Sequence, residues 1–219
     1  MGGAAVFDLD RTLTKRGTWG RFIAFANAGR PAFWLGTPIV VAQAITYKLG
    51  LARRSSVKER SIQFLLTNLS RERLKQKAEE FAEHEVSTGL RAKARAVIEE
   101  HRARGDEVVI ASAACDLVVT PIARRLRMHQ VICTRMRWKK DGRPSSILDG
   151  QNCYGPEKLN RILEAWGSTH AYKPVTAYSD HISDLGLLKW ADRGVAVNPS
   201  RSLLLAAKQN KFKVVDWDQ

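Results

Sequence analysis

The two ends of the chain alternate short apolar segments with patterns of helical period. Six segments are short, apolar or β-branched, and bounded by polar or turn residues, as strands are. They occupy residues 4–9, 107–111, 130–134, 175–179, 194–197 and 213–215. Between them, helical periods cover residues 90–104, 116–127, 156–166, 184–191 and 200–208. This alternation predicts βαβ units around a mostly parallel sheet with helices on both faces.

Residues 135–150 interrupt that alternation. They form two extended runs around Asp141-Gly142, a pair that is typical of tight hairpin turns. We therefore expect a β-hairpin at this place in the sheet.

Residues 15–88 contain no convincing strand and several helical periods. Trp19, Phe22, Ile23 and Ala26 are spaced as one face of a helix. Further helices are expected over residues 32–48, 55–68 and 71–87, the last with Ser70 as its N-cap. The fold class is therefore α/β, with a core made of residues 1–14 and 89–219. Residues 15–88 form an all-helical cap inserted after the first strand.

One cap segment raises the question of a membrane. Residues 31–47 carry no charge, and basic residues follow at Lys48, Arg53 and Arg54. A spanning helix needs about 20 mostly apolar residues, and this run is shorter and interrupted by Gly36 and Pro38. We expect an ordinary buried helix, and a helix lying at a membrane interface is the alternative.

Composition supports a folded chain with an anionic partner. Of 219 residues, 44% are hydrophobic and 26% charged, which excludes a disordered chain. The formal net charge is +14, and residues 15–104 carry +10 of it. Such an excess favours nucleic acid, a membrane surface or phosphorylated substrates. Because the chain contains no nucleic-acid recognition motif, we expect no nucleic-acid partner.

The expected compartment follows from the cysteines and the N-terminus. The three cysteines are an odd number, well separated and without a CxxC pair, which is typical of a reducing compartment. No signal peptide precedes the first strand. A cytoplasmic location is expected, with peripheral contact to the inner membrane as an option.

Four acidic residues follow two of the predicted strands. Asp8 and Asp10 end the first strand, where they point the same way if the strand stays extended. Asp180 and Asp184 follow strand 175–179. Taken alone, the first pair could be a calcium loop or a turn, and the second a helix cap. Gathered at one sheet edge, carboxylates repel each other unless a cation relieves them, and Mg²⁺ prefers oxygen ligands.

Two further positions are suited to binding an anion at the same edge. Ser112 and Ala113 follow strand 107–111 and precede a predicted helix, so a hydroxyl and backbone N–H groups are available there. Lys158 falls in the first turn of helix 156–166, where a cation opposes the helix dipole. A turn serine and a solvated lysine are the ordinary alternatives.

The ordered set of Asp8-Leu9-Asp10-Arg11-Thr12, Ser112, Lys158 and Ser179-Asp180-His181-Ile182-Ser183-Asp184 resembles the four motifs of the haloacid dehalogenase superfamily. Members are mostly Mg²⁺-dependent phosphatases with an aspartyl-phosphate intermediate and a Rossmann-like core. The helical insertion resembles the cap of the phosphoserine-phosphatase-like branch.

The resemblance implies a role for each motif residue. Asp8 would be the nucleophile and Asp10 the general acid and base. Asp8, Asp180 and the backbone carbonyl of Asp10 would hold Mg²⁺, with Asp184 in support. The phosphate would bind Ser112, the backbone at Ala113 and Lys158. Thr12 would support the loop, and Arg11 departs from the glycine that many relatives carry.

The cap suggests a substrate class. Residues 31–47, the basic turn 51–54 and the stretch 150–158 look closest to bacterial phosphatidylglycerophosphatase C and related cell-envelope phosphatases. That resemblance implies a lipid phosphate at the cytoplasmic membrane face. The alternative substrate is a small soluble one, phosphoserine or a sugar phosphate. A catalytically silent phosphate-binding protein is disfavoured because Asp8 and Asp10 are intact.

Overall fold

The computed structural model describes residues 2–167 and 171–219. Its centre is a seven-stranded sheet in the order β4-β3-β2-β1-β5-β6-β7. The strands are β1 (Ala4–Phe7), β2 (Glu107–Cys115), β3 (Gln130–Trp138), β4 (Pro144–Asp149), β5 (Val175–Ser179), β6 (Arg193–Val197) and β7 (Lys213–Val215). Neighbouring strands run parallel except β3 and β4, which form the expected hairpin. The predicted α/β fold with a mostly parallel sheet is confirmed.

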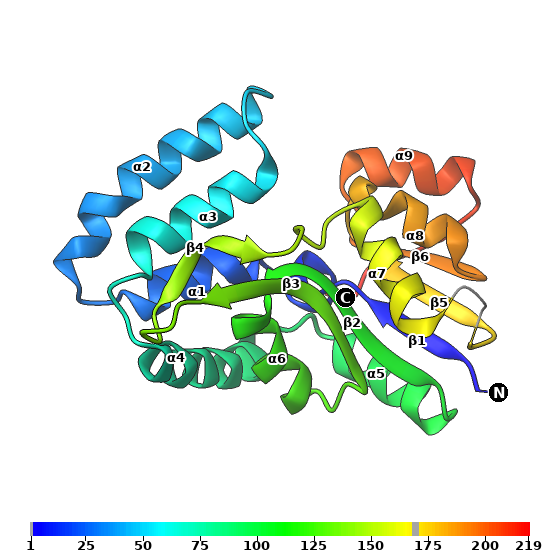
Figure 1. Ribbon diagram of the computed structural model, residues 1–219. Coiled ribbons are helices and arrows are strands. Elements are labelled where there is room, and N and C mark those ends of the chain that lie inside the picture. The colour runs from blue at the N-terminus through cyan, green and yellow to red at the C-terminus, as the bar shows by residue number, and fades with distance from the viewer. Residues whose placement is uncertain (1, 168–170) are drawn as a thin grey trace.

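Helices cover both faces of the sheet, because the central strands are apolar on both sides. In β1, Ala5 and Phe7 belong to one apolar cluster and Ala4 and Val6 to the other. The first cluster is covered by α5 (Ala94–Ala103) and α6 (Asp116–Arg125). The second is covered by α7 (Pro156–Trp166), α8 (Leu185–Trp190) and α9 (Arg201–Gln209). Figure 1 shows these two helical layers below and above the sheet.

Four helices precede α5 on the chain between β1 and β2, as the helical periods predict. They are α1 (Thr18–Ala26), α2 (Pro31–Lys48), α3 (Arg54–Leu65) and α4 (Arg71–His84). Phe22, Ile62 and Phe81, from α1, α3 and α4, are buried in the same cluster as the α5–α6 face. Ser70 caps α4 by accepting a hydrogen bond from the Arg73 amide, as expected. The division into a core and a cap stays a prediction.

Helix α2 differs from its expectation. It packs mainly on α3 and lies at the edge of the molecule (Figure 1). Large apolar side chains on α2 and just after it are exposed: Trp34 (74%), Leu35 (80%), Ile39, Val41, Ile45, Leu49 and Leu51. The expectation of an ordinary buried helix is wrong, because the helix is apolar all round and one neighbour covers only one side.

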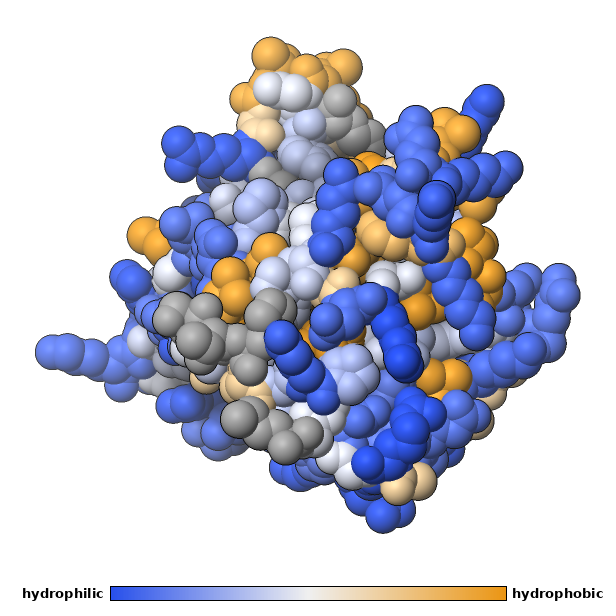
Figure 2. Space-filling model, turned by 90° about the vertical axis from the view of Figure 1, so that its right-hand side faces the viewer, coloured by the Kyte–Doolittle hydropathy of each residue, from blue (hydrophilic) through white to orange (hydrophobic). Residues whose placement is uncertain are grey.

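The outer end of α2 forms an apolar projection. In Figure 2, hydrophobic atoms gather at the top of the molecule, at the height of the α2–α3 connection, above a largely hydrophilic face. Among the described residues, no helix combines the length and apolar character that crossing a bilayer requires.

Two strand ends that differ from the sequence prediction shape the carboxyl edge of the sheet. Strand β1 ends at Phe7 rather than at residue 9, because a wide helical turn, Leu9–Leu13, follows Asp8. Strand β2 continues to Cys115 rather than ending at residue 111. Its pairing with β3 shifts between Ser112 and Cys115, so the strand bulges there.

Candidate active site

Asp8 lies at the centre of the carboxyl edge of the sheet. Its amide continues the β1–β5 ladder by donating to the Tyr178 carbonyl at 3.0 Å. Its carboxylate is buried and accepts hydrogen bonds on both oxygens, from Lys158 Nζ to Oδ1 (2.8 Å) and from Thr12 Oγ1 to Oδ2 (3.0 Å). The predicted nucleophile is therefore fixed in direction from both sides.

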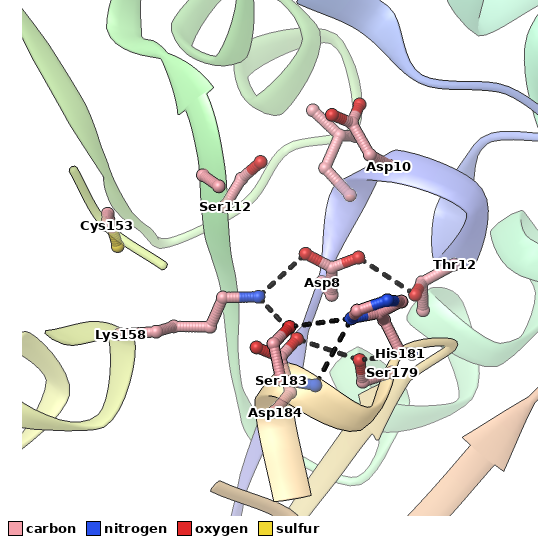
Figure 3. A network of polar contacts seen from close by, with 12 residues as sticks. Asp8, Asp10, Thr12, Ser112, Cys153, Lys158, Ser179, His181, Ser183 and Asp184 are labelled. Atoms are coloured by element: carbon pink, nitrogen blue, oxygen red, sulfur yellow. Dashed lines mark hydrogen bonds and ion pairs between the residues drawn. The ribbon is translucent and has the colours of Figure 1, made fainter. Parts of the chain in front are cut away.

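Asp10 does not point the same way as Asp8, contrary to the expectation for an extended strand. The turn after Phe7 bends the chain, and Arg11 takes a left-handed conformation with φ of 65°. The Asp10 Oδ1 atom accepts two hydrogen bonds from Thr18, from its amide and its hydroxyl, each 2.7 Å. Asp10 is thereby attached to the first residue of α1, and Figure 3 shows it apart from the Asp8 network.

The backbone conformation of Arg11 explains why glycine suits this position, where this chain carries arginine. A left-handed backbone favours glycine, the residue that many relatives carry at this place. The Arg11 carbonyl is held by Arg91, through Nε at 2.9 Å and a second guanidinium nitrogen at 2.7 Å. The Arg11 side chain is exposed and lines the cavity above Asp8, which leaves it available to a substrate.

Lys158 is buried between two carboxylates. Although it lies in the first turn of α7, only 2% of it is exposed, and its Nζ donates to Asp8 Oδ1 (2.8 Å) and to Asp184 Oδ2 (2.6 Å) (Figure 3). Ser179 holds Asp184 Oδ2 from the other side at 2.8 Å. Burial opposes the charge of Lys158, but Asp184 and Asp8 outweigh it and hold its pKa above the usual range. The sequence analysis noted that a cation opposes the helix dipole at this position, and the structure supplies two carboxylates as the anionic partners of Lys158.

The carboxylates carry more negative charge than Lys158 neutralises. Burial raises the pKa of Asp8 to about 7 despite Lys158, and Asp184 and Asp180 add to the rise. Burial likewise raises the pKa of Asp180. The Thr12 hydroxyl contacts both Asp8 and Asp180, which places those carboxylates side by side. Such a group gains stability from a proton or a second cation.

The same residues can hold a divalent cation. In the described part of the chain, no three His, Cys, Asp or Glu side chains form a metal site by themselves. The expected ligand set needs only the side chains of Asp8 and Asp180, because its third member is the Asp10 carbonyl. The buried Oδ1 of Asp184 lacks a hydrogen-bond partner among the described residues. A group of oxygen atoms with excess negative charge suits Mg²⁺.

The expected phosphate-binding residues lie on the β2 bulge. Helix α6 begins at Asp116, as predicted, but Ser112 lies within β2 rather than after it, and its hydroxyl accepts from the Ala114 amide at 3.1 Å. The bulge turns the Ala113 carbonyl toward the cap and places Ala113 on the wall of the Asp8 cavity. Ser112 itself is fully buried.

Lys58 of α3 was missed by the sequence analysis. Its Nζ donates to the Ala113 carbonyl and, at 2.6 Å, to Asn152 Oδ1, and it lies 3.5 Å from Thr134 Oγ1. The Thr134 hydroxyl also donates to the Ala113 carbonyl, at 2.8 Å. Lys58 therefore ties α3 to the bulge. No sequence signal distinguishes it from the surface lysines of a basic segment.

A cavity of about 310 Å³ joins these residues. It is lined by Asp8, Asp10, Arg11, Gly17, Ala113, Tyr154, Lys158, Asp180, His181, Ser183 and Asp184. His181, whose role the sequence left open, is at its wall, where its Nδ1 accepts from the Ser183 amide at 3.2 Å. The cavity brings together most of the predicted site residues, whereas Ser112 and Thr12 lie behind its wall.

Comparison with known proteins agrees with this arrangement. The family model of haloacid dehalogenase-like hydrolases matches residues 5–189. Protein CicA of Caulobacter vibrioides is 32% identical over 188 residues, covering 85% of this chain and 82% of its own. A histidinol-phosphatase of Neisseria meningitidis is 27% identical over 156 residues, covering 69% and 70% of the two chains.

A solved structure shares the fold over the whole length of this chain. It is a phosphoserine phosphatase captured as an analogue of its phospho-aspartyl intermediate. It superimposes with a TM-score of 0.66 at 18% identity and covers 100% of this chain and 94% of its own. The likeness includes the helices between β1 and β2, because no part of this chain lies outside the match.

Proposed function

Starting from the premise that the chain belongs to the haloacid dehalogenase-like hydrolases and is a phosphatase of that family, we propose that it is a Mg²⁺-dependent phosphomonoesterase with an aspartyl-phosphate intermediate on Asp8. The observation that carries this proposal is the buried Asp8 carboxylate, held at 2.8 Å by Lys158 and facing a cavity that Asp10 also lines. The phosphoserine phosphatase with the same fold supports it through its phospho-aspartyl form.

The first half of the reaction transfers the phosphoryl group. One oxygen of Asp8 attacks phosphorus, the ester bond to the alcohol breaks, and Asp10 gives its proton to the departing oxygen. In the second half, Asp10 takes a proton from water, which attacks the aspartyl-phosphate and releases inorganic phosphate and free Asp8. The two hydrogen bonds from Thr18 fix the direction of Asp10 in both halves.

Positive charge around the phosphoryl group comes from two sources. Lys158 and the backbone at Ala113 stabilise its oxygens, with Ser112 shaping the bulge behind them. Mg²⁺, held by Asp8, Asp180 and the Asp10 carbonyl with Asp184 in support, would neutralise charge on the phosphate and on the carboxylates. Thr12 keeps Asp8 and Asp180 together.

Replacement of Asp8 tests the mechanism. Asp8→Asn is expected to abolish Mg²⁺-dependent hydrolysis of an aryl phosphate while leaving the circular dichroism spectrum unchanged. Asp10→Asn is expected to retain the phosphoryl group on the protein, because hydrolysis of the aspartyl-phosphate needs the base. Full activity of Asp8→Asn would refute the covalent mechanism.

For the substrate, we propose a lipid phosphate, such as phosphatidylglycerophosphate, at the cytoplasmic face of an anionic membrane. The exposed apolar side chains of α2 support this, since they stand next to basic residues such as Arg53. Apolar surface together with positive charge is what attracts an amphipathic element to anionic lipid. A small soluble phosphate ester is the second candidate, supported by the similarity to a histidinol-phosphatase.

Flotation with vesicles separates the two candidates. The protein should float with phosphatidylglycerol vesicles at low salt and less at high salt, where the attraction is screened. Leu35→Glu should weaken flotation, whereas Leu205→Glu, an exposed leucine on α9, serves as the matched control. Absence of flotation at low salt, or equal loss in both variants, would rule out membrane contact by α2.

A further inference from the structure

A second cavity adjoins the catalytic one beneath the cap helices. Its volume is about 360 Å³, and it lies between α1, α2, α3 and the bulge of β2. Most of its wall is apolar or aromatic, supplied by Trp19, Ile23, Val40, Ala44, Tyr47 and Val57. Its apolar wall contrasts with the charged groups along the rest of the sheet edge, which suggests that the cavity has a function of its own.

The position of Asp10 connects the two cavities. Asp10 and Ala113 line both of them. In the proposed mechanism the leaving oxygen of the substrate accepts its proton from Asp10, so that oxygen lies at the junction. The atoms attached to it then extend away from Asp8, into the second cavity.

Several polar side chains of the second cavity already bond to protein groups. Trp19 Nε1 donates to Ser61 Oγ at 3.1 Å, and Ser61 Oγ donates to the Lys58 carbonyl at 2.6 Å. Lys58 Nζ is bound to the Ala113 carbonyl and to Asn152. A polar leaving group here would have to break these bonds or be buried with its own groups unsatisfied, and both are costly.

We propose that this cavity binds the leaving group and selects monophosphate esters of alcohols that are apolar next to the ester oxygen. The inference rests on the proposed phosphatase function and narrows its substrate class. Among the proposed lipid phosphates it favours those whose phosphorylated alcohol is a hydrocarbon, and it sets aside phosphatidylglycerophosphate, the example named above, because the alcohol of that ester is a glycerol. It disfavours phosphoserine and sugar phosphates.

A polar cavity nearby provides the alternative path. It is lined by Arg53, Ser55, Glu59 and Gln151 among others, and it meets the catalytic cavity at Tyr154. Asp10 is not part of its wall. A leaving group directed there would be polar and would not reach the proposed acid, so substrate preference distinguishes the two paths.

The experiment measures kcat/KM for methyl, ethyl, butyl and hexyl phosphate, with glycerol 3-phosphate and phosphoserine for comparison. No vesicles are present and concentrations stay below micelle formation, so membrane contact plays no part. Each added methylene is expected to raise kcat/KM about two- to fourfold while the cavity fills. A flat series, or preference for glycerol 3-phosphate or phosphoserine, would overturn the inference while leaving the phosphatase intact.

Two variants test whether the second cavity causes the preference for longer alkyl chains, and a third variant is the control. Ala44→Trp fills the cavity and should lower the ratio of hexyl to methyl phosphate activity about tenfold or more. Val40→Thr keeps the volume and adds a hydroxyl, so it should lower the same ratio a few-fold even where tryptophan disturbs folding. Ala42→Trp, on the exposed side of α2, should keep the ratio of the wild type.

The outcomes separate the two proposals. An unchanged ratio in both cavity variants would place the alkyl chain elsewhere and refute this inference. If the wild type hydrolyses none of the esters and no aryl phosphate, the proposed function fails and the inference with it.

Discussion

Replacing Lys158 with methionine tests the charge balance of the site. Lys158 is 2% exposed and bound to Asp8 and Asp184 at 2.8 and 2.6 Å. Removing one partner of such a buried pair leaves uncompensated charge and costs about 3–5 kcal/mol. For a chain of this size, that loss lowers the melting temperature by roughly 6–20 °C.

The loss should depend on pH in a definite direction. Burial already raises the pKa of Asp8 to about 7, and loss of Lys158 raises it further. A folded-state pKa above the unfolded value means that folded protein binds the proton more tightly, so stability falls as pH rises toward that pKa. At pH 5.5 Asp8 is protonated in the wild type and in Lys158→Met alike. The variant should therefore lose less stability relative to the wild type at pH 5.5 than at pH 8.

Urea unfolding at pH 5.5 and pH 8, with a chelator present, measures both effects. Lys158→Arg retains the charge and should lose less than Lys158→Met at pH 8. Lys189→Met, at an exposed position of α8, should change stability by no more than about 0.5 kcal/mol. A loss for Lys158→Met that is equal at the two pH values, or no larger than the control, would refute the view that Lys158 compensates these carboxylates.

Three further outcomes are expected. Asp10→Asn should slow phosphoryl transfer from an alkyl phosphate by about 10²–10⁴, and from an aryl phosphate less, because a phenolate needs little protonation to depart; release of the alcohol or the phenol in the first turnover measures both. Because Mg²⁺ competes with the proton on Asp8, whose pKa is about 7, the rise in melting temperature that Mg²⁺ causes should be larger at pH 8 than at pH 6. Burial lowers the pKa of His101 despite Asp106 at 2.6 Å, so the contribution of His101 to stability should fall below about pH 6.5 as the unfolded chain takes up a proton. In urea unfolding at pH 5.5 and 7.5, His101→Gln should flatten that dependence.

The sequence predicted the elements well where periodicity is strong. Strands β5 and β7 and helix α7 have the predicted bounds, since each is short and ends at a turn or cap. The two errors in strand length come from local backbone geometry. The turn after Asp8 and the bulge after Ser112 depend on hydrogen bonds from residues far along the chain, such as Arg91 to the Arg11 carbonyl. Strand patterns carry no signal for them.

The site was predictable as a set of residues but not as a geometry. Asp8, Lys158 and Asp184 meet because the carboxyl ends of β1 and β5 and the start of α7 share one edge of the sheet, as parallel topology requires. The direction of Asp10 depends on the Arg11 conformation and on Thr18, which no spacing rule includes. Burial of α2 was mispredicted because an apolar run does not reveal how many neighbours cover it.

The helices after β1 influence chemistry as well as access. Thr18 at the start of α1 fixes Asp10, and Lys58 of α3 fixes the carbonyl beside the phosphate-binding backbone. Asp10 and Lys58 both line the apolar cavity, and α1, α2 and α3 supply most of its wall. A leaving group that fits the cavity therefore packs against the elements that position the proposed general acid.

A group that does not fit would push α1 or α3 outward and move Asp10 or the bulge with it. Because an error of about 1 Å in a reacting geometry costs on the order of 100-fold in rate, such a substrate would lose kcat as well as affinity. The apolar cavity should therefore select substrates through kcat as much as through KM.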